Sequence, residues 1–142
     1  MSKFKLAVLI SGGGSNLQAI IDSCQKPKYP AQIVRVISST EKAYGLQRAL
    51  KAGIPTSVID HSNFSNRMDF EAAMSAELRS CGTELVCLAG FMRLLTETFV
   101  GEWAGRLINI HPSLLPSFKG LDTHERALAA GVRIAGCTVH FV

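Results

Sequence analysis

The stretch R-L-I-N-I-H-P-S-L-L-P, residues 106–116, carries an amide and an imidazole at a spacing that suits acyl-group chemistry. Arg106 to His111 predicts a short buried strand, which ends there because Pro112 cannot donate to a ladder. Side chains alternate along a strand, so Asn109 and His111 share one face, roughly 7 Å apart. An Asn amide donates to an oxygen that gains negative charge, and a His moves protons near neutral pH. The pair suits the tetrahedral intermediate formed when an amine attacks a carbonyl.

The pair alone leaves a second interpretation open. In that interpretation His111 is a hydrogen-bonded buried histidine that ends the strand. The position at the carboxyl end of a strand favours chemistry, because ligands bind at that edge of open α/β sheets.

A second motif, S-G-G-G-S-N at residues 11–16, follows the apolar run Phe4–Ile10, which predicts a central parallel strand. A glycine turn that leads into a helix presents backbone N–H groups and the positive end of the helix dipole, which favours a phosphate. No Gly-Lys-Ser/Thr follows, and Leu17 stands where a dinucleotide fingerprint needs its third glycine. Three residues of the motif are therefore expected to hold a single phosphate: Gly14, Ser15 and Asn16. The alternative is a tight turn in which one of the two polar residues caps the helix.

A third motif, G-F-M-R-L-L at residues 90–95, follows the strand predicted over Glu84–Ala89. Apolar residues beside Arg93 could line a pocket for a flat ligand with an acidic tail. The alternative is a loop that covers the core and leaves Arg93 solvated.

The rest of the chain alternates strands and helices, as a doubly wound parallel sheet requires. Further strands are predicted over Gln32–Ser38, Thr56–Ile59 and Gly136–Val142. Helices are predicted from Leu17 to Cys24 and over Ala43–Ala52, Met68–Ser80, Thr96–Val100 and Thr123–Ala130. The predicted fold is α/β, a mainly parallel sheet with helices on both faces, in which the three motifs meet at one sheet edge.

Composition sets limits on the class of protein. The 142 residues are 47% hydrophobic with a mean hydropathy of +0.21, enough for one domain with a core. No apolar run approaches the ~20 residues of a membrane span, and no signal segment is visible. The net charge of +4 is scattered, which fits an anionic small substrate and does not demand nucleic acid. Four cysteines without a C-x-x-C predict reduced thiols in the cytoplasm and no metal site.

Together, V-L-I-S-G-G-G-S-N-L-Q-A-I-I, L-A-G-F-M-R-L-L and N-I-H-P-S-L-L-P resemble the phosphoribosylglycinamide formyltransferase family. The resemblance covers essentially the whole chain, in the family's order and spacing. The last motif belongs to a wider formyltransferase superfamily. The glycine-rich motif near the N-terminus narrows the resemblance to this one family. The resemblance implies one Rossmann-like catalytic domain over residues 1–142. It also implies formyl transfer from the co-substrate 10-formyltetrahydrofolate to the amino group of glycinamide ribonucleotide, a step of purine biosynthesis.

The resemblance also implies roles for particular residues. Asn109 would bind the formyl oxygen, His111 would act as the general acid, and His140 would be a second active-site histidine. The ribonucleotide phosphate would lie on Gly14, Ser15 and Asn16. The folate would lie on Arg67, Met92, Arg93, Leu94 and Leu95. Both substrates are small molecules, and no metal, nucleic acid or membrane is implied; a homodimer is compatible with the sequence, which does not decide the oligomeric state.

One departure from the family concerns the end of the chain. Family members continue after the strand equivalent to T-V-H-F-V into a loop whose Asp pairs with the catalytic histidine and raises its pKa. This sequence stops at Val142, before that loop. We therefore expect a longer native protein, of roughly 190–220 residues, with a C-terminal part that the 142 residues lack.

Two related enzymes and one non-catalytic domain remain as alternatives. Formyltetrahydrofolate deformylase would use similar residues with water as the acceptor, but normally carries an N-terminal regulatory domain, whereas Met1 stands just before the first strand. Methionyl-tRNA formyltransferase shares the Asn-x-His pattern but needs a tRNA-binding domain and a basic surface. A non-catalytic phosphate-binding domain would bind glycinamide ribonucleotide without turnover.

Overall fold

The computed structural model describes residues 3–111, 126, 129–130 and 138–142. Its strands are β1 (Phe4–Ile10), β2 (Ala31–Ser38), β3 (Thr56–Val58), β4 (Leu85–Leu88), β5 (Leu107–His111) and β6 (Thr138–Phe141). Its helices are α1 (Ser15–Cys24), α2 (Gly45–Lys51), α3 (Arg67–Ser80) and α4 (Glu97–Glu102), with a 3-10 turn η1 (His61–Asn63). No helix in these described segments is both long and apolar enough to cross a bilayer.

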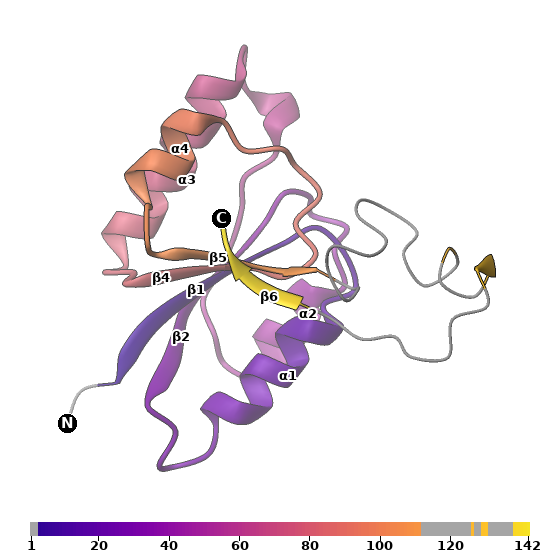
Figure 1. Cartoon of the computed structure of the whole chain (residues 1–142). Helices are drawn as coiled ribbons and strands as arrows, with labels where there is room; N and C mark the ends of the chain where they lie inside the picture. The colour runs from indigo at the N-terminus through magenta and orange to yellow at the C-terminus, as the bar shows by residue number, and fades with distance from the viewer. Residues whose placement is uncertain (1–2, 112–125, 127–128, 131–137) are drawn as a thin grey trace.

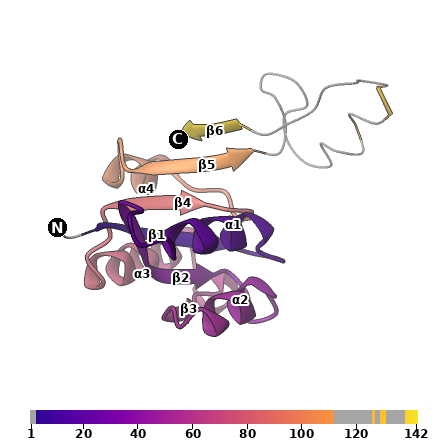
Figure 2. The same cartoon turned by 90° about the horizontal axis from the view of Figure 1, so that it is seen from below.

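The described strands form one twisted sheet in the order β3-β2-β1-β4-β5-β6, and Figure 2 shows them stacked in that order. Neighbouring strands run parallel from β3 to β5, and β6 runs antiparallel to β5. In Figure 1, α3 and α4 lie above the sheet, and α1 and α2 lie below it. The predicted α/β fold, a mainly parallel sheet with helices on both faces, is therefore confirmed.

The first five strands lie within one residue of their predicted bounds at each end. This agreement follows from burial, because parallel strands covered on both faces read as nearly continuous apolar runs. The helix predicted over Thr123–Ala130 falls largely outside the described residues, and so do the first residues of the strand predicted over Gly136–Val142.

The core has two layers, one on each face of the sheet. The layer under α3 and α4 contains Phe70, Met74 and Leu78, all at most 2% exposed, as the helical spacing predicts. The layer facing α1 and α2 contains Cys87, and burial raises the pKa of this thiol to about 11. Cys87 is therefore a packing residue whose reactive thiolate is suppressed at neutral pH.

The loop after β4 is held at its far end by a buried carboxylate. Thr96 is the N-cap of α4, as predicted, and its hydroxyl accepts from the N–H of Phe99. Glu71 of α3, only 4% exposed, accepts from the Thr96 N–H at 2.7 Å and also from the Thr96 hydroxyl. Helix α3 thus holds Thr96, the residue that directly follows the 90–95 loop.

Candidate active site

Strand register brings one residue from each of four neighbouring strands into a row. Leu9 of β1 pairs with Leu88 of β4, Leu88 with Asn109 of β5, and Asn109 with His140 of β6. Strand β1 ends one residue after Leu9, and β4 ends at Leu88. The loops that follow β1 and β4 therefore begin beside Asn109.

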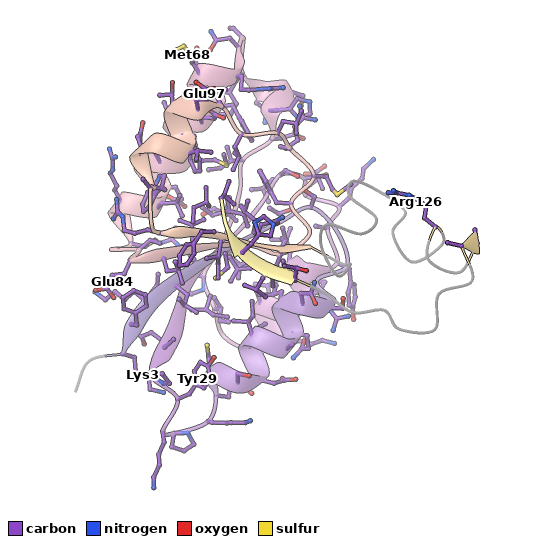
Figure 3. All side chains as sticks on the ribbon, in the orientation of Figure 1. Lys3, Tyr29, Met68, Glu84, Glu97 and Arg126 are labelled. Carbon is purple, nitrogen blue, oxygen red and sulfur yellow. The ribbon has the colours of Figure 1, made fainter. Side chains whose placement is uncertain are left out.

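The opposite edge of the sheet is marked in Figure 3 by Lys3, Tyr29 and Glu84. Each of these residues lies shortly before a strand, namely β1, β2 or β4. They therefore mark the amino edge of the sheet. The candidate site lies at the other, carboxyl edge, where open α/β sheets bind ligands.

The side chains of Asn109 and His140 are in contact. The Nδ2 atom of Asn109 lies 3.3 Å from Nε2 of His140, and Nδ1 of His140 lies 3.1 Å from the carbonyl oxygen of Phe141. A carbonyl only accepts, so Nδ1 carries the ring proton and Nε2 accepts from the Asn109 amide. In this tautomer the Asn109 side chain presents its NH₂ group, and not its oxygen, to His140. Among the described residues, the second hydrogen of Nδ2 has no partner.

His111 is the last residue of β5, and its backbone stands opposite Thr138 of β6. Its side chain lies outside the described part of the chain. The predicted face shared by Asn109 and His111 therefore stays a prediction for the imidazole.

The glycine loop, Gly12–Asn16, joins β1 to α1. Gly14 is the N-cap of α1 with φ +78°, and no side chain caps the helix. The alternative in which Ser15 or Asn16 acts as a cap is therefore not what the structure shows. The first N–H groups of α1 are left without a side-chain cap, and this is the arrangement that binds anions.

A pocket of about 260 Å³ lies over the glycine loop. It is lined by Gly12, Gly13, Gly14, Ser15, Asn16, Arg48, Ala89 and Gly90. The loop packs closely on α2, because a Cβ at Gly14 would lie 2.8 Å from the Cα of Gly45. The Gly45 N–H also donates to the Gly12 carbonyl at 3.0 Å. All three residues expected to hold a phosphate line this pocket.

Arg48 is the basic side chain of this pocket and was not predicted from the sequence. Its Nε donates to the Gly13 carbonyl at 2.8 Å, and it stacks over the Tyr44 ring at 5.1 Å. Arg48 comes from α2, 35 residues after Gly13. No local pattern signals a contact of this kind, because it depends on how α2 packs against the loop.

A second pocket, of about 250 Å³, lies between η1, the start of α3 and the loop after β4. We refer to it as the arginine pocket. It is lined by His61, Phe64, Ser65, Asn66, Arg67, Phe70, Arg93 and Leu94. Arg67 is the first residue of α3, one position before the predicted helix start, and Asn66 is the N-cap. The structure thus brings Arg67 and Arg93 to one pocket with phenylalanine rings beside them.

The four residues Met92–Leu95 divide between solvent and core. Met92 is 60% exposed and Leu94 is 77% exposed, whereas Leu95 packs against the core layer under α3 and α4. Exposed apolar side chains beside a pocket offer surface to an apolar ligand. The alternative in which this loop only covers the core therefore holds for Leu95 and not for Met92 or Leu94.

One carboxylate belongs to the surroundings of the arginine pocket. The N–H and the hydroxyl of Ser62 donate to Asp60 and lower the pKa of its carboxyl, and His61 and Arg93 lower it further. Asp60 also lies 3.4 Å from Nδ1 of His61. Asp60 is therefore a negative charge near Arg93.

Comparison with known proteins gives consistent results. A family model described as formyl transferase matches residues 4–142. The crystal structure of phosphoribosylglycinamide formyltransferase from Brucella melitensis has a TM-score of 0.95 at 47% identity, and covers 99% of this chain and 73% of that chain. The chain belongs to the phosphoribosylglycinamide formyltransferase family.

Curated members of this family are longer than the chain. The phosphoribosylglycinamide formyltransferase of Escherichia coli (strain K12) is 47% identical over 137 residues, which are 96% of this chain and 65% of that protein. The trifunctional purine biosynthetic protein adenosine-3 of Homo sapiens is 55% identical over 140 residues, 99% of this chain and 14% of that protein. The chain therefore spans less than two thirds of these relatives.

Within this formyltransferase fold, the structure groups the predicted site residues in three places. Gly14, Ser15 and Asn16 line one pocket, Arg67, Arg93 and Leu94 line a second, and Asn109 contacts His140 in the row of paired residues. No group of three or more potential metal-ligating side chains gathers among the described residues. The sequence did not indicate Arg48, His61 or the hydroxyl of Ser11, although Ser11 directly precedes the glycines of its motif.

Proposed function

We propose that this protein transfers a formyl group from 10-formyltetrahydrofolate to the amino group of glycinamide ribonucleotide, as a cytoplasmic enzyme of purine biosynthesis. The observation that carries the proposal is the Asn109–His140 contact, which lies in a row at the carboxyl edge of the sheet. The loops that begin beside this row line the two pockets. Two pockets are what a reaction between two substrates requires.

The ribonucleotide phosphate is assigned to the pocket over the glycine loop. The first N–H groups of α1 and the positive end of its dipole favour an anion there. The Arg48 guanidinium lines the same pocket and adds positive charge. Gly14, Ser15 and Asn16 are the proposed phosphate ligands.

The folate is assigned to the loop after β4 and the arginine pocket. Met92 and Leu94 offer exposed apolar surface for the flat ring system. Arg67 and Arg93 line a pocket that suits the acidic tail of a folate, since guanidinium groups bind carboxylates through paired hydrogen bonds. Leu95 supports this loop from the core side.

The proposed reaction is direct attack of the substrate amine on the formyl carbon. The new C–N bond forms as the carbonyl electrons move to oxygen, and the second Nδ2 hydrogen of Asn109 donates to this oxyanion. His140 is a positioning residue, because its Nε2 holds the other amide hydrogen. His111 is the proposed general acid, which protonates folate N10 as the C–N10 bond breaks. The oxyanion returns to a carbonyl as the C–N10 bond breaks. The attacking nitrogen loses one proton, which replaces the proton that His111 gives to N10, and no covalent enzyme intermediate forms.

The test is a formyl-transfer assay on the full-length protein, followed by the change in folate absorbance. Wild type should turn over only when both substrates are present. Asn109→Ala and His111→Ala should each lower kcat about 100-fold or more, with little change in either KM. Asn63→Ala is the matched control, because Asn63 is an exposed residue of η1 and lines neither pocket.

Two outcomes would contradict the proposal. Release of formate without the ribonucleotide would indicate the deformylase alternative, in which water is the acceptor. Binding of both ligands without turnover by the full-length protein would indicate a binding domain.

A further inference from the structure

The hydroxyl of Ser11 lies between the two loops that form the proposed substrate sites. Ser11 is the residue between the end of β1 and the glycine loop. Its Oγ accepts from the Met92 N–H at 2.8 Å, and its own N–H donates to the Gly90 carbonyl at 3.1 Å. These two hydrogen bonds join the glycine loop to the loop after β4, across 81 residues of sequence.

The Ser11 hydroxyl is itself held in place by a buried partner. Its Oγ lies 2.6 Å from Oγ of Ser39, which is 7% exposed and follows β2. The Ser39 N–H in turn donates to the Ile10 carbonyl at 3.0 Å. The orientation of the Ser11 side chain is therefore set by the ends of two adjacent strands.

Met92 depends on this hydrogen bond for its position. Its side chain is 60% exposed, whereas the preceding Phe91 packs partly buried against the core, so burial holds Phe91 but not Met92 itself. The far end is anchored separately, by Leu95 in the core and by Thr96 on Glu71. Ser11 thus holds the start of the loop after β4 through the Met92 N–H. Ser11 is also the residue directly before Gly12, the first residue of the glycine loop.

We propose that Ser11 is a positioning residue that couples the two substrate sites. A phosphate that orders the glycine loop also restricts the backbone of the adjacent Ser11, and the Ser11 hydroxyl carries this restriction to the Met92 peptide and to the loop that binds the folate. Each ligand then tightens the binding of the other by the same factor, because coupling between two sites is reciprocal. The inference rests on the proposed function, since it needs both substrates to occupy the assigned pockets.

The experiment measures ligand binding to the full-length protein by calorimetry. The Kd of tetrahydrofolate, which has no formyl group to transfer, is measured with and without saturating glycinamide ribonucleotide, and the reciprocal pair is measured as well. In wild type each ligand should tighten the other about fivefold, at the low end of typical couplings. Ser11→Ala should bring this factor close to one, and Ser11→Thr, which keeps a hydroxyl, should restore most of it.

The matched control is Ser80→Ala, which removes a hydroxyl that donates to the Glu77 carbonyl at 2.7 Å, on the surface of α3. This control should keep the wild-type coupling. If Ser11→Ala does not fold, Ser39→Ala serves as the second variant, because it removes the partner of Ser11 without touching either loop. It should reduce the coupling by at least half.

The outcomes separate this inference from the proposed function. Binding of both ligands by wild type with no mutual effect would overturn the coupling. Unchanged coupling in the Ser11 or Ser39 variant would overturn the role of Ser11, and both outcomes leave the function standing. Failure of wild type to bind either ligand would overturn both. Loss of coupling in Ser11→Ala with retained binding of each single ligand would support the role of Ser11.

Discussion

The glycine loop and the arginine pocket lie at the same edge of the sheet, but they are built from different groups. The glycine loop presents backbone N–H groups at the start of α1, and its shape depends on close packing against α2. The arginine pocket presents long side chains from the start of α3 and from the loop after β4. One site is made of main chain that packs on a helix at Gly14, and the other is made of side chains at the surface.

This difference predicts two kinds of response to mutation. A backbone site fails when one atom is added, because the N–H groups move together with the chain. A side-chain site loses affinity in steps, since each cation contributes its own hydrogen bonds. Mutations at the two sites should therefore differ in the size of their effects.

Gly14→Ala should cause the largest loss. The added Cβ would lie 2.8 Å from the Gly45 Cα, and alanine would have to adopt φ +78°. The free energy of unfolding should fall by about 2–4 kcal/mol, from backbone strain together with overpacking. The KM for the ribonucleotide should rise about tenfold or more, because the N–H groups of the loop are displaced. Urea unfolding and steady-state kinetics measure the two effects.

The chain offers a matched control for this variant in Gly53. Gly53 has φ +71°, yet a Cβ there would meet nothing within 4 Å. Gly53→Ala should therefore lose only about 1 kcal/mol, from backbone strain alone, and keep both KM values. Equal losses of stability in the two variants would show that the packing against α2 is unimportant.

Arg67→Ala and Arg93→Ala should have an intermediate effect. Each should raise the KM for 10-formyltetrahydrofolate about tenfold, the size expected for a lost charged hydrogen bond. Both should leave the KM for the ribonucleotide and the stability nearly unchanged, because these side chains lie at the surface of the pocket. Arg79→Ala is the control on the same helix as Arg67, since Arg79 pairs instead with Glu102 at 3.0 Å. A loss of kcat with unchanged KM would contradict this assignment.

Asp60→Asn should have the smallest effect, in the opposite direction. Removing a negative charge near Arg93 should lower the KM for the folate about twofold, as expected for an exposed charge. Hydrogen bonds from Ser62 lower the Asp60 pKa, so the carboxylate stays ionised as pH falls towards its usual range. The ratio of the KM for the folate in Asp60→Asn to that in wild type should therefore be constant between about pH 6 and 8. A ratio that returns to one at the acidic end of this range would argue against a lowered pKa.

The sequence predicted the strands well because their signal is local. Each central strand is an apolar run bounded by glycine, proline or polar residues, and burial on both faces requires such a run. The antiparallel direction of β6 has no local signal, since it depends on the path of the connection from β5. One alternative for the start of α1 was wrong. It had Ser15 or Asn16 as the N-cap, whereas the N-cap is Gly14.

The candidate site was predictable only where its residues share a motif. Alternation along one strand grouped Asn109 with His111, but His140 was assigned through family resemblance alone. The contact between Asn109 and His140 follows from the register of β5 and β6, which joins positions 31 residues apart. The same reason applies to Arg48 and Ser11, whose partners come from distant elements and depend on packing rather than on sequence spacing.

The close approach of α2 to the glycine loop also bears on how members of such a family can diverge. A Cβ at Gly45 would lie 2.5 Å from the Cδ1 of Ile10 and 3.4 Å from the Cα of Gly14. A larger residue at position 45 would therefore have to displace the end of the Ile10 side chain, and a smaller residue at position 10 would relieve that contact. Substitutions at positions 10 and 45 are therefore expected to depend on one another, so that a larger residue at position 45 is better tolerated beside a smaller one at position 10.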